Sequence, residues 1–550
     1  MLHRESTEDH IEKVCAIEKR ADLCLEHLSL ASIPGHLAVW TVLSTTVAMI
    51  EENHAQFGPT SPRFQAAMLN LTRYCPMLVR WLKGLSRGRP PTDWQPTWDP
   101  ALDALARRDL ATVQNYDAFQ FSYPMWYRDR AHAEILDDNS VRFTVDGGTR
   151  DRQVSAYHKG IRPLEGLYKA IPGVGVEPTE AIMRRYQRIL SEASATDRYG
   201  FAYEHSYALA RRSYNKYTQR LETMVRRNDD PDLGSYTLSV FKRFYAALQA
   251  ICAIHEYLCF CWMKWENPYP LSSAVMVKSQ NEWIKLLGNL AGVDPSTAES
   301  ILSDLTFYSK RLPDLNVYPF VPLDESRGTI ALIPHFVLNS NPEENILRIC
   351  SYHRPKVYDL LSNDKEAIMR ETLVGHLGSY GVDHSIQLPD GSAEIDLVIE
   401  DESSSTAVIA ELKWYRKPTT YRERLRADEQ FLDGMHRQLR RIKLFCREHP
   451  DFLEQRGALK RNLTEYKNVH YLLIARDYWI WIEPRDQSAV VDFEQFRFAV
   501  GRHQTLESTV SEVLAYEWLP VEGKDFNVRY DRRTVEGVAV ESEVFYAGPH

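Results

Sequence analysis

Two acidic side chains and one lysine interrupt two strongly β-prone runs near residue 400. The first run, residues 394–399, reads EIDLVI and carries Asp396, and the second, residues 408–413, reads VIAELK and carries Glu411 and Lys413. Side chains alternate between the two faces of a strand, so each run has an apolar face and a face with charged groups. Two carboxylates and an ammonium group on one sheet face suit the metal-assisted hydrolysis of a phosphodiester.

A hairpin would bring the two acids together, and the polar connector DESSS between the runs is short enough for its loop. If Glu400 pairs with Ala407, Asp396 falls opposite Glu411 on the same face, with their Cβ atoms about 4.5–5.5 Å apart. Carboxylates at that separation repel, and a hard divalent cation between them removes the repulsion. Lys413, on the same face, would orient an attacking water or offset charge on a phosphate.

This pattern resembles the active-site motif of the PD-(D/E)xK nuclease superfamily, which includes many restriction enzymes and Holliday-junction resolvases. The matching residues are Asp396 and the tripeptide Glu411-Leu412-Lys413, and the resemblance covers roughly residues 345–485. It implies a restriction-endonuclease-like α/β domain with a central mixed sheet. In that family the two acids and the carbonyl of the middle residue, here Leu412, bind Mg²⁺ (or Mn²⁺), and the lysine assists the water. The implied substrate is nucleic acid, with DNA favoured over RNA.

The resemblance suggests two further site residues. Family members often take a glutamate from the helix before the first strand. We expect this helix over residues 363–380, and we favour Glu371, which lies on a face with small residues, over Glu366. Some members carry a glutamine on the helix after the motif, four residues before a tyrosine. Gln438 is similar in position, although Ile442 stands where the tyrosine would be.

The literal Pro-Asp dipeptide of this chain, Pro389-Asp390, lies upstream of the motif. The sequence Pro-Asp-Gly-Ser has the composition of a turn between a strand expected over residues 383–388 and the next strand. We therefore assign the metal-binding aspartate to Asp396.

Basic side chains gather directly after the motif. The whole chain has a net charge of −9, so nucleic acid would have to meet a local basic patch. Residues 411–449 hold eleven Lys and Arg against six acids, a local charge of +5. We therefore expect Arg437, Arg440 and Arg441, together with Gln438, to contact nucleic acid. The alternative is an ordinary solvated helix face.

A purely structural explanation of the motif was also weighed. Glu411 and Lys413 could form an ion pair on a half-exposed strand, and such pairs contribute little stability. That explanation does not account for acids placed inside runs as apolar as EIDLVI and VIAELK. A catalytically silent nucleic-acid-binding or scaffold protein that retains the nuclease fold is the competing class of function.

Other chemistries find less support in the sequence. His255, Cys259 and Cys261 could ligate zinc, but no fourth ligand is evident, and thiols in an apolar helix are commonly buried. Residues 171–176 lack the third glycine of a dinucleotide-binding loop, and no Walker or G-x-S-x-G motif occurs. Tyrosines and arginines interleaved over residues 203–220 fit either base stacking or, better, an amphipathic helix.

The chain as a whole predicts an α+β multidomain protein. Its 550 residues, with 44% hydrophobic and 26% charged, suit three or four domains. A mostly helical N-terminal region is expected to precede the nuclease domain. The predicted units are a mostly helical domain with a β-hairpin (1–160), a helical domain (161–312), an extended bridge (313–344), the nuclease domain (345–500) and a C-terminal extension (501–550).

The expected location is the cytoplasm. The scattered cysteines fit a reducing compartment, and the first residues lack the apolar core of a signal peptide. The most hydrophobic stretch, residues 244–263, contains Gln249, His255 and Glu256, so we expect a buried helix and no contact with a membrane.

The helical region is expected to select substrate or to bind a protein partner or activator. Cleavage of both strands of a duplex would suit a homodimer. A large helical region fused to such a nuclease is similar to bacterial defence systems against phage or foreign DNA, an analogy at the level of the fold.

Overall fold

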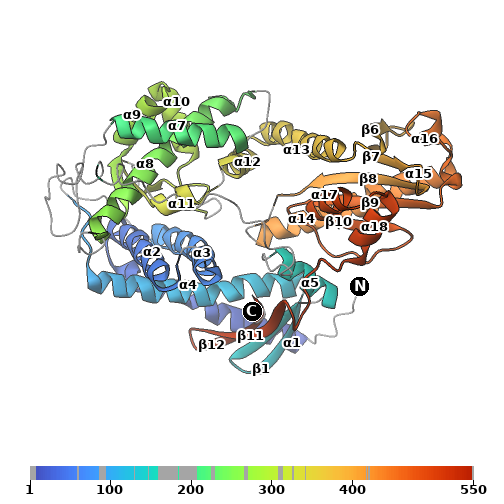
Figure 1. Ribbon diagram of the computed structural model, residues 1–550. Coiled ribbons are helices and arrows are strands. Elements are labelled where there is room, and N and C mark those ends of the chain that lie inside the picture. The colour runs from blue at the N-terminus through green and yellow to red at the C-terminus, as the bar shows by residue number, and fades with distance from the viewer. Residues whose placement is uncertain are drawn as a thin grey trace.

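The computed structural model places a large helical body beside a body built on a five-stranded sheet, with a small sheet below them (Figure 1). The residues that the structure describes are 8–58, 61–85, 94–128, 131–145, 148–158, 184, 207–224, 230–264, 270–307, 314–324, 328–340, 342–416, 418 and 421–547. The architecture is a mixture of helices with antiparallel and mixed sheets, as the sequence predicts at this coarse level.

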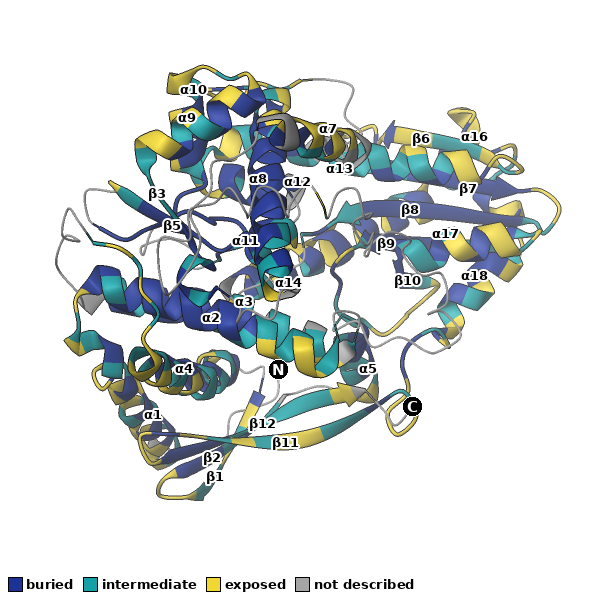
Figure 2. Ribbon diagram, turned by 60° about the vertical axis from the view of Figure 1, so that its left-hand side comes forward, coloured by how far each residue is buried: buried dark blue, intermediate teal, exposed yellow. Residues whose placement is uncertain are grey.

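The helical body surrounds one extensive apolar core. Its helices are α2 (Gly35–Phe57), α3 (Pro62–Leu85), α4 (Pro100–Tyr127), α7 (Tyr207–Met224), α8 (Leu238–Lys264), α9 (Gln280–Ala291), α10 (Pro295–Asp304), α11 (Pro334–Leu338) and α12 (Pro342–His353). Helix α1 (Glu8–Asp22) packs against the small sheet, and α5 (Thr149–His158) packs into the body with the five-stranded sheet. Helix α8 runs through the core of the helical body (Figure 2). The one described helix long and apolar enough to cross a membrane, Leu238–Met263, lies within α8, and 83% of its apolar window is buried in the protein. The expected buried helix is therefore observed.

Helix α7 has the amphipathic character that the sequence favours over base stacking. In α7, Tyr214 packs into the core while Arg211, Arg212 and Lys216 are exposed, as in an amphipathic helix. The residues of the helix expected before Tyr207 lie outside the described residues, as do residues 171–176.

The segment expected to bridge the two bodies belongs instead to the helical body. Strands β4 (Val321–Pro322) and β5 (Thr329–Leu332) join β3 (Met276–Ser279) in a three-stranded sheet of order β3-β5-β4. Its buried residues lie in the same core as α8. The extended pattern is observed in β4 and β5, whereas residues 336–338 form α11, and the sequence does not indicate that β5 pairs with β3.

Five strands form the sheet that carries the candidate site. They are β6 (Gly381–Gln387), β7 (Glu394–Asp401), β8 (Thr406–Trp414), β9 (Asn468–Arg476) and β10 (Ser488–Asp492), in the order β10-β9-β8-β7-β6. Strands β6, β7 and β8 are antiparallel neighbours, and β9 and β10 continue the sheet in parallel with β8. Glu400 pairs with Ala407, which confirms the predicted hairpin register. The buried central strand β8 is evident in Figure 2.

Helices cover both faces of this sheet. One face packs against α13 (Pro355–His376), α17 (Phe493–Arg502) and α18 (Leu506–Ala515). The other face packs against one continuous helical rod, made of α14 (Tyr421–Asp433), a π-helical turn (434–439) and α15 (Arg440–Glu448). A rod over residues 424–448 was expected, but its π-helical turn was not.

Gly434 begins that π-helical turn close to the sheet. A Cβ atom at this position would lie 3.0 Å from the hydroxyl oxygen of Tyr415 and 3.7 Å from Leu473 Cδ1. The hydroxyl of Tyr415 donates to the carbonyl oxygen of Gln430, 3.2 Å away in the same rod. Glycine therefore lets the rod approach the end of β8, and π-helical turns are frequent at functional sites.

The C-terminal hairpin joins an earlier hairpin of the chain in a four-stranded sheet. Strands β1 (Ala131–Asp137) and β2 (Ser140–Val145) form a hairpin, and so do β11 (Phe526–Val535) and β12 (Val538–Ala547). Strand β12 lies parallel to β2, with Val540 opposite Val141. The C-terminal residues thus complete the small sheet beside α1 and α4 (Figure 1). Because β2 and β12 are about four hundred residues apart in the sequence, no local sequence pattern predicts this pairing.

Several short elements differ from the sequence-based expectation. The sequence favours strands over residues 153–157, 336–338 and 478–482. Residues 153–157 instead lie in helix α5, residues 336–338 lie in α11, and residues 478–482 form no strand. Apolar runs of five residues or fewer do not distinguish helix from strand. Prolines explain two of the helix starts, because Pro334 and Pro355 occupy the first turns of α11 and α13, where a missing N–H costs nothing.

Candidate active site

The hairpin register brings the predicted acids to one end of the sheet. Asp396 is the third residue of β7, and Glu411 lies near the end of its antiparallel neighbour β8. Continuing the pairing of Leu397 with Ala410 places Asp396 opposite Glu411. The main-chain N–H of Leu412 donates to Asp396 Oδ2 at 2.7 Å, so this carboxylate lies against β8 at the motif.

Lys413 completes the group as the sequence predicts. Its Nζ lies 2.8 Å from Glu411 Oε1 and 3.5 Å from Glu366 Oε1. Leu412, which lies between Glu411 and Lys413 in β8, packs into the apolar core on the opposite face of the sheet. One ammonium group therefore faces two carboxylates, from β8 and from α13, and the Asp396 carboxylate adjoins it.

Glu366, and not Glu371, is the glutamate of α13 that reaches this site. Glu371 is exposed, whereas Glu366 lies within reach of Lys413. The two positions are five residues apart, about 140° around a helix. Helix α13 packs on the sheet through Met369 and Leu373, the face that includes Glu366. The useful signal was this stripe of large apolar residues, and the preference for a face of small residues was misleading.

Burial shapes the electrostatics of the acids. The side chain of Glu411 is only 3% exposed. Burial and the neighbouring Asp396 carboxylate raise its pKa to about 8, against the lowering effect of Lys413. Burial likewise raises the pKa of Asp396 to about 6, while Lys413 and the Leu412 N–H oppose the shift. Burial disfavours the ammonium of Lys413, but the surrounding carboxylates outweigh it and raise its pKa, so the lysine stays charged.

The residues present fit a hard divalent cation. Glu411 Oε2 is buried and has no hydrogen-bond partner, and such an orphaned carboxylate oxygen needs a cation or a proton. Asp396, Glu411 and the Leu412 carbonyl would supply oxygen ligands. Mg²⁺ commonly uses only one or two carboxylates and fills its octahedron with waters and substrate phosphate oxygens. The set is thus sufficient for Mg²⁺ or Mn²⁺ without a third acid.

A second group of potential ligands lies elsewhere. Among the described residues, Glu51, Glu256 and His335 are the one set of three His, Cys, Asp or Glu side chains whose ligand atoms all lie within 4.8 Å of one another. This set belongs to the helical body, and sequence analysis did not single it out. The zinc ligands weighed above are not part of it: His255 Nε2 lies 2.8 Å from the carbonyl oxygen of Ser273.

The predicted basic residues form an open groove beside the site. Its volume is about 490 Å³. It is lined by Asp390, His436, Arg437, Arg440, Arg441, Leu444, Phe445 and Glu448. Arg441 donates to the carbonyl oxygen of Ser392 at 2.7 Å, so the groove borders the turn that leads into β7 and Asp396.

Gln438 and Asp390 occupy more peripheral positions. Gln438 is half-buried, and its Oε1 lies 3.8 Å from where a Cβ of Gly434 would be. Asp390 is exposed and accepts a hydrogen bond from the Ser392 N–H at 3.0 Å, as expected for a turn residue. The metal-binding aspartate is therefore assigned to β7 and not to this turn.

Two cations that sequence analysis missed flank Trp414, the residue after Lys413. The Arg476 guanidinium lies 4.0 Å from the Trp414 ring centroid, and Lys365 Nζ lies 5.1 Å from it. The indole N–H donates to Asp477 at 2.6 Å. Arg476 ends β9 and Lys365 precedes Glu366 on α13, so only the sheet order reveals that they border the site.

Comparison with known proteins adds no relative: no family model, no curated protein and no solved structure matches this chain.

The raised pKa values predict a pH dependence of metal affinity. A metal ligand must be deprotonated, so below pH 8 binding at Glu411 must release its proton, and below pH 6 that of Asp396 as well. We expect the apparent Mn²⁺ affinity to fall up to about tenfold per pH unit between pH 8 and 6, and more steeply below pH 6. Calorimetric titrations with Mn²⁺ across pH 5.5–8.5 measure this affinity. An affinity that stays flat over this range would contradict metal binding at Glu411.

Proposed function

We propose that this protein is a divalent-metal-dependent nuclease that hydrolyses phosphodiester bonds, with DNA the favoured substrate. The observation that carries the proposal is the convergence of Asp396, Glu411 and Lys413 at one end of a sheet, with a buried Glu411 oxygen that has no hydrogen-bond partner. A structural ion pair between Glu411 and Lys413 would not require the second carboxylate, that of Asp396, beside it.

Each residue has a distinct part in the proposed reaction. When bound, the metal ion would supply Lewis acidity toward a phosphate oxygen and toward water. Asp396 and Glu411 hold the cation, and the Leu412 N–H fixes the Asp396 carboxylate in place. Lys413 stays protonated, so it can orient the attacking water or stabilise negative charge developing on the phosphate. Glu366 positions Lys413 from the side of α13.

The experiment that tests the proposal uses the purified full-length protein. Linear, circular and single-stranded DNA and RNA are incubated with Mg²⁺, Mn²⁺ or EDTA. We expect cleavage that EDTA abolishes and that Asp396→Asn reduces at least about 100-fold. Asp138→Asn is the matched control, because the same chemical change falls in the exposed turn between β1 and β2, outside the groove, and should leave cleavage unchanged.

Three outcomes are informative. Equal cleavage by wild type and Asp396→Asn would place the chemistry elsewhere. Nucleic-acid binding without cleavage under any metal would favour the alternative, a catalytically silent binding or scaffold protein. Mn²⁺ binding at this site without cleavage would indicate a nuclease that needs an activator, for which the helical body would be the receptor.

The basic groove predicts a salt-dependent contribution to binding. Arg437 and Arg440 are exposed, and neither holds the turn before β7 as Arg441 does. We expect the double change Arg437→Ala, Arg440→Ala to weaken DNA binding several-fold. The slope of log affinity against log salt should fall by roughly 0.9 for each phosphate that the variant no longer neutralises.

Arg447→Ala provides the control for this pair. Arg447 is an exposed arginine of the same helix α15 but does not line the groove. Fluorescence anisotropy over a range of salt concentrations measures both variants. An unchanged slope in the double variant would show that DNA follows another surface.

A further inference from the structure

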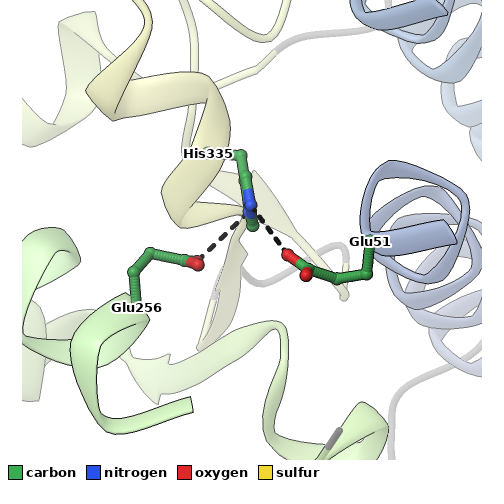
Figure 3. A group of neighbouring side chains, drawn as sticks. All are labelled: Glu51, Glu256 and His335. Atoms are coloured by element: carbon green, nitrogen blue, oxygen red, sulfur yellow. Dashed lines mark ion pairs between the residues drawn. The ribbon is translucent and has the colours of Figure 1, made fainter. Parts of the chain in front are cut away.

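Three side chains from three helices converge in the helical body, outside the body with the five-stranded sheet (Figure 3). Glu51 lies on α2, Glu256 on α8 and His335 on α11. His335 Nε2 is 3.1 Å from Glu51 Oε1, and its Nδ1 is 3.2 Å from Glu256 Oε1. Each of the three side chains is less than one-fifth exposed. Helices from three separate parts of the sequence thus place two carboxylates and one imidazole together.

The surroundings make two unneutralised carboxylates in this cluster energetically unfavourable. Glu256 belongs to the apolar helix α8, next to His255 and the buried Cys252 and Cys259. Two carboxylates that share a partly buried site repel one another and lose hydration. Some positive group must therefore lie between them.

Two atoms of the cluster lack hydrogen-bond partners. His335 Nδ1 and Glu256 Oε1 are both buried and both unpartnered, and their 3.2 Å approach does not have hydrogen-bond geometry. Buried polar atoms are normally satisfied, so two orphaned atoms that face each other indicate a missing ligand. A further imidazole is near: His54 Nδ1 lies 3.9 Å from Glu51 Oε2, one turn along α2.

We propose that Glu51, Glu256 and His335 bind a divalent transition-metal ion, with Zn²⁺ as the best match. Two carboxylate oxygens and one imidazole nitrogen suit zinc, whereas Mg²⁺ prefers oxygen ligands alone. Three protein ligands leave a fourth tetrahedral position for water or for His54. Small movements of the flexible glutamates would bring their oxygens to zinc distance. The ion would fasten α2, α8 and α11 together and is independent of the nuclease proposal.

The competing occupant is a proton. Burial lowers the pKa of His335, but Glu256 and Glu51 outweigh that effect and raise it to about 10, so an imidazolium could bridge the two carboxylates. The proton and the metal ion make different predictions, because only a metal ion binds as a countable equivalent of Zn²⁺ and can be replaced by Co²⁺, which has a ligand-field spectrum.

The test uses the full chain carrying Asp396→Asn and Glu411→Gln, so that the sheet site does not contribute metal. Equilibrium dialysis against Zn²⁺ should give one bound equivalent per chain. Co²⁺ substitution should give visible absorption bands of a low-coordinate site with nitrogen and oxygen ligands. Adding His335→Gln should weaken Zn²⁺ binding about 100-fold or more, and Glu256→Gln should do the same.

Glu52→Gln is the matched control. Glu52 adjoins Glu51, points to Arg107 and is 60% exposed, so its change should leave Zn²⁺ binding intact. Zn²⁺ should also raise the thermal unfolding midpoint of the parent and of the Glu52→Gln variant, but not of the Glu256→Gln variant.

The proposal is overturned if the folded parent protein binds no stoichiometric Zn²⁺, or if Glu51→Gln and Glu256→Gln bind it as tightly as the parent does. Either result would assign the cluster to an imidazolium bridge. Should His335→Gln not fold, the two glutamate variants and the Co²⁺ spectrum of the parent still decide the question.

Discussion

Lys413→Ala is expected to lower phosphodiester cleavage by about 10²–10⁴-fold while the protein stays folded. Lys413 is the one ammonium group within 3.5 Å of both Glu411 and Glu366 among the described residues. Its side chain is 18% exposed, so it lies close enough to solvent to meet a substrate phosphate. Removing it takes away the ammonium group that can neutralise charge as it develops on that phosphate.

The fold should survive this change because the acids can take up protons. Without Lys413 the pKa values of Asp396 and Glu411 rise further, so both carboxyls become neutral near pH 7 and no unpaired charge remains buried. The variant should therefore keep its circular dichroism spectrum at pH 7. Its Mn²⁺ affinity should change less than its rate, since added metal restores the positive charge.

Lys460→Ala is the matched control for Lys413→Ala. Lys460 pairs with Glu402 in the turn at the far end of β7 and β8, and it is 68% exposed. We expect its cleavage rate to equal that of the wild type. Single-turnover rates at saturating Mn²⁺ measure all three proteins. If the Lys413→Ala variant cleaves as fast as the control, the lysine has no part in the reaction, and its contact with Glu411 is a structural ion pair.

Local pattern predicted the hairpin and the acids because every step was short in sequence. Asp396 and Glu411 are fifteen positions apart, and alternation along β7 and β8 fixes which face each side chain occupies. The register that pairs Glu400 with Ala407 puts the two acids on one face, and the structure has this pairing. A one-residue slip would have turned Asp396 and Glu411 to opposite faces.

The rest of the site depends on contacts that no local pattern reports. The choice between Glu366 and Glu371 required knowing which face of α13 packs on the sheet. Arg476 borders the site because β9 lies beside β8, an adjacency of strands sixty residues apart. The convergence of α2, α8 and α11 at His335 spans most of the helical body. Tertiary packing fixed each of these, and sequence spacing does not contain it.

Glu411→Gln is expected to abolish cleavage and at the same time to stabilise the metal-free protein at pH 8. The folded pKa of Glu411, about 8, lies above its ordinary value of 4.5. The unfolded chain therefore loses this proton before the folded chain does, and stability falls as the pH rises between these two values. For one such group the slope is at most about 1.36 kcal/mol per pH unit. Glutamine cannot ionise, so the variant should lose this part of the pH dependence.

The metal ion distinguishes a ligand from a structural ion pair at this position. Saturating Mn²⁺ should raise the unfolding midpoint of the wild type at pH 8 and leave that of Glu411→Gln nearly unchanged, since binding stabilises only the protein that binds. Glu402→Gln, in the exposed turn after β7, is the control and should respond as the wild type does. Thermal unfolding at pH 5 and pH 8, with and without Mn²⁺, gives the comparison. If Glu411→Gln instead destabilises the metal-free protein at pH 8 and still responds fully to Mn²⁺, Glu411 serves to hold Lys413 and the cation is bound elsewhere. A residue whose replacement removes activity but adds stability is retained for its chemical role, so this result would identify this end of the sheet as an active site.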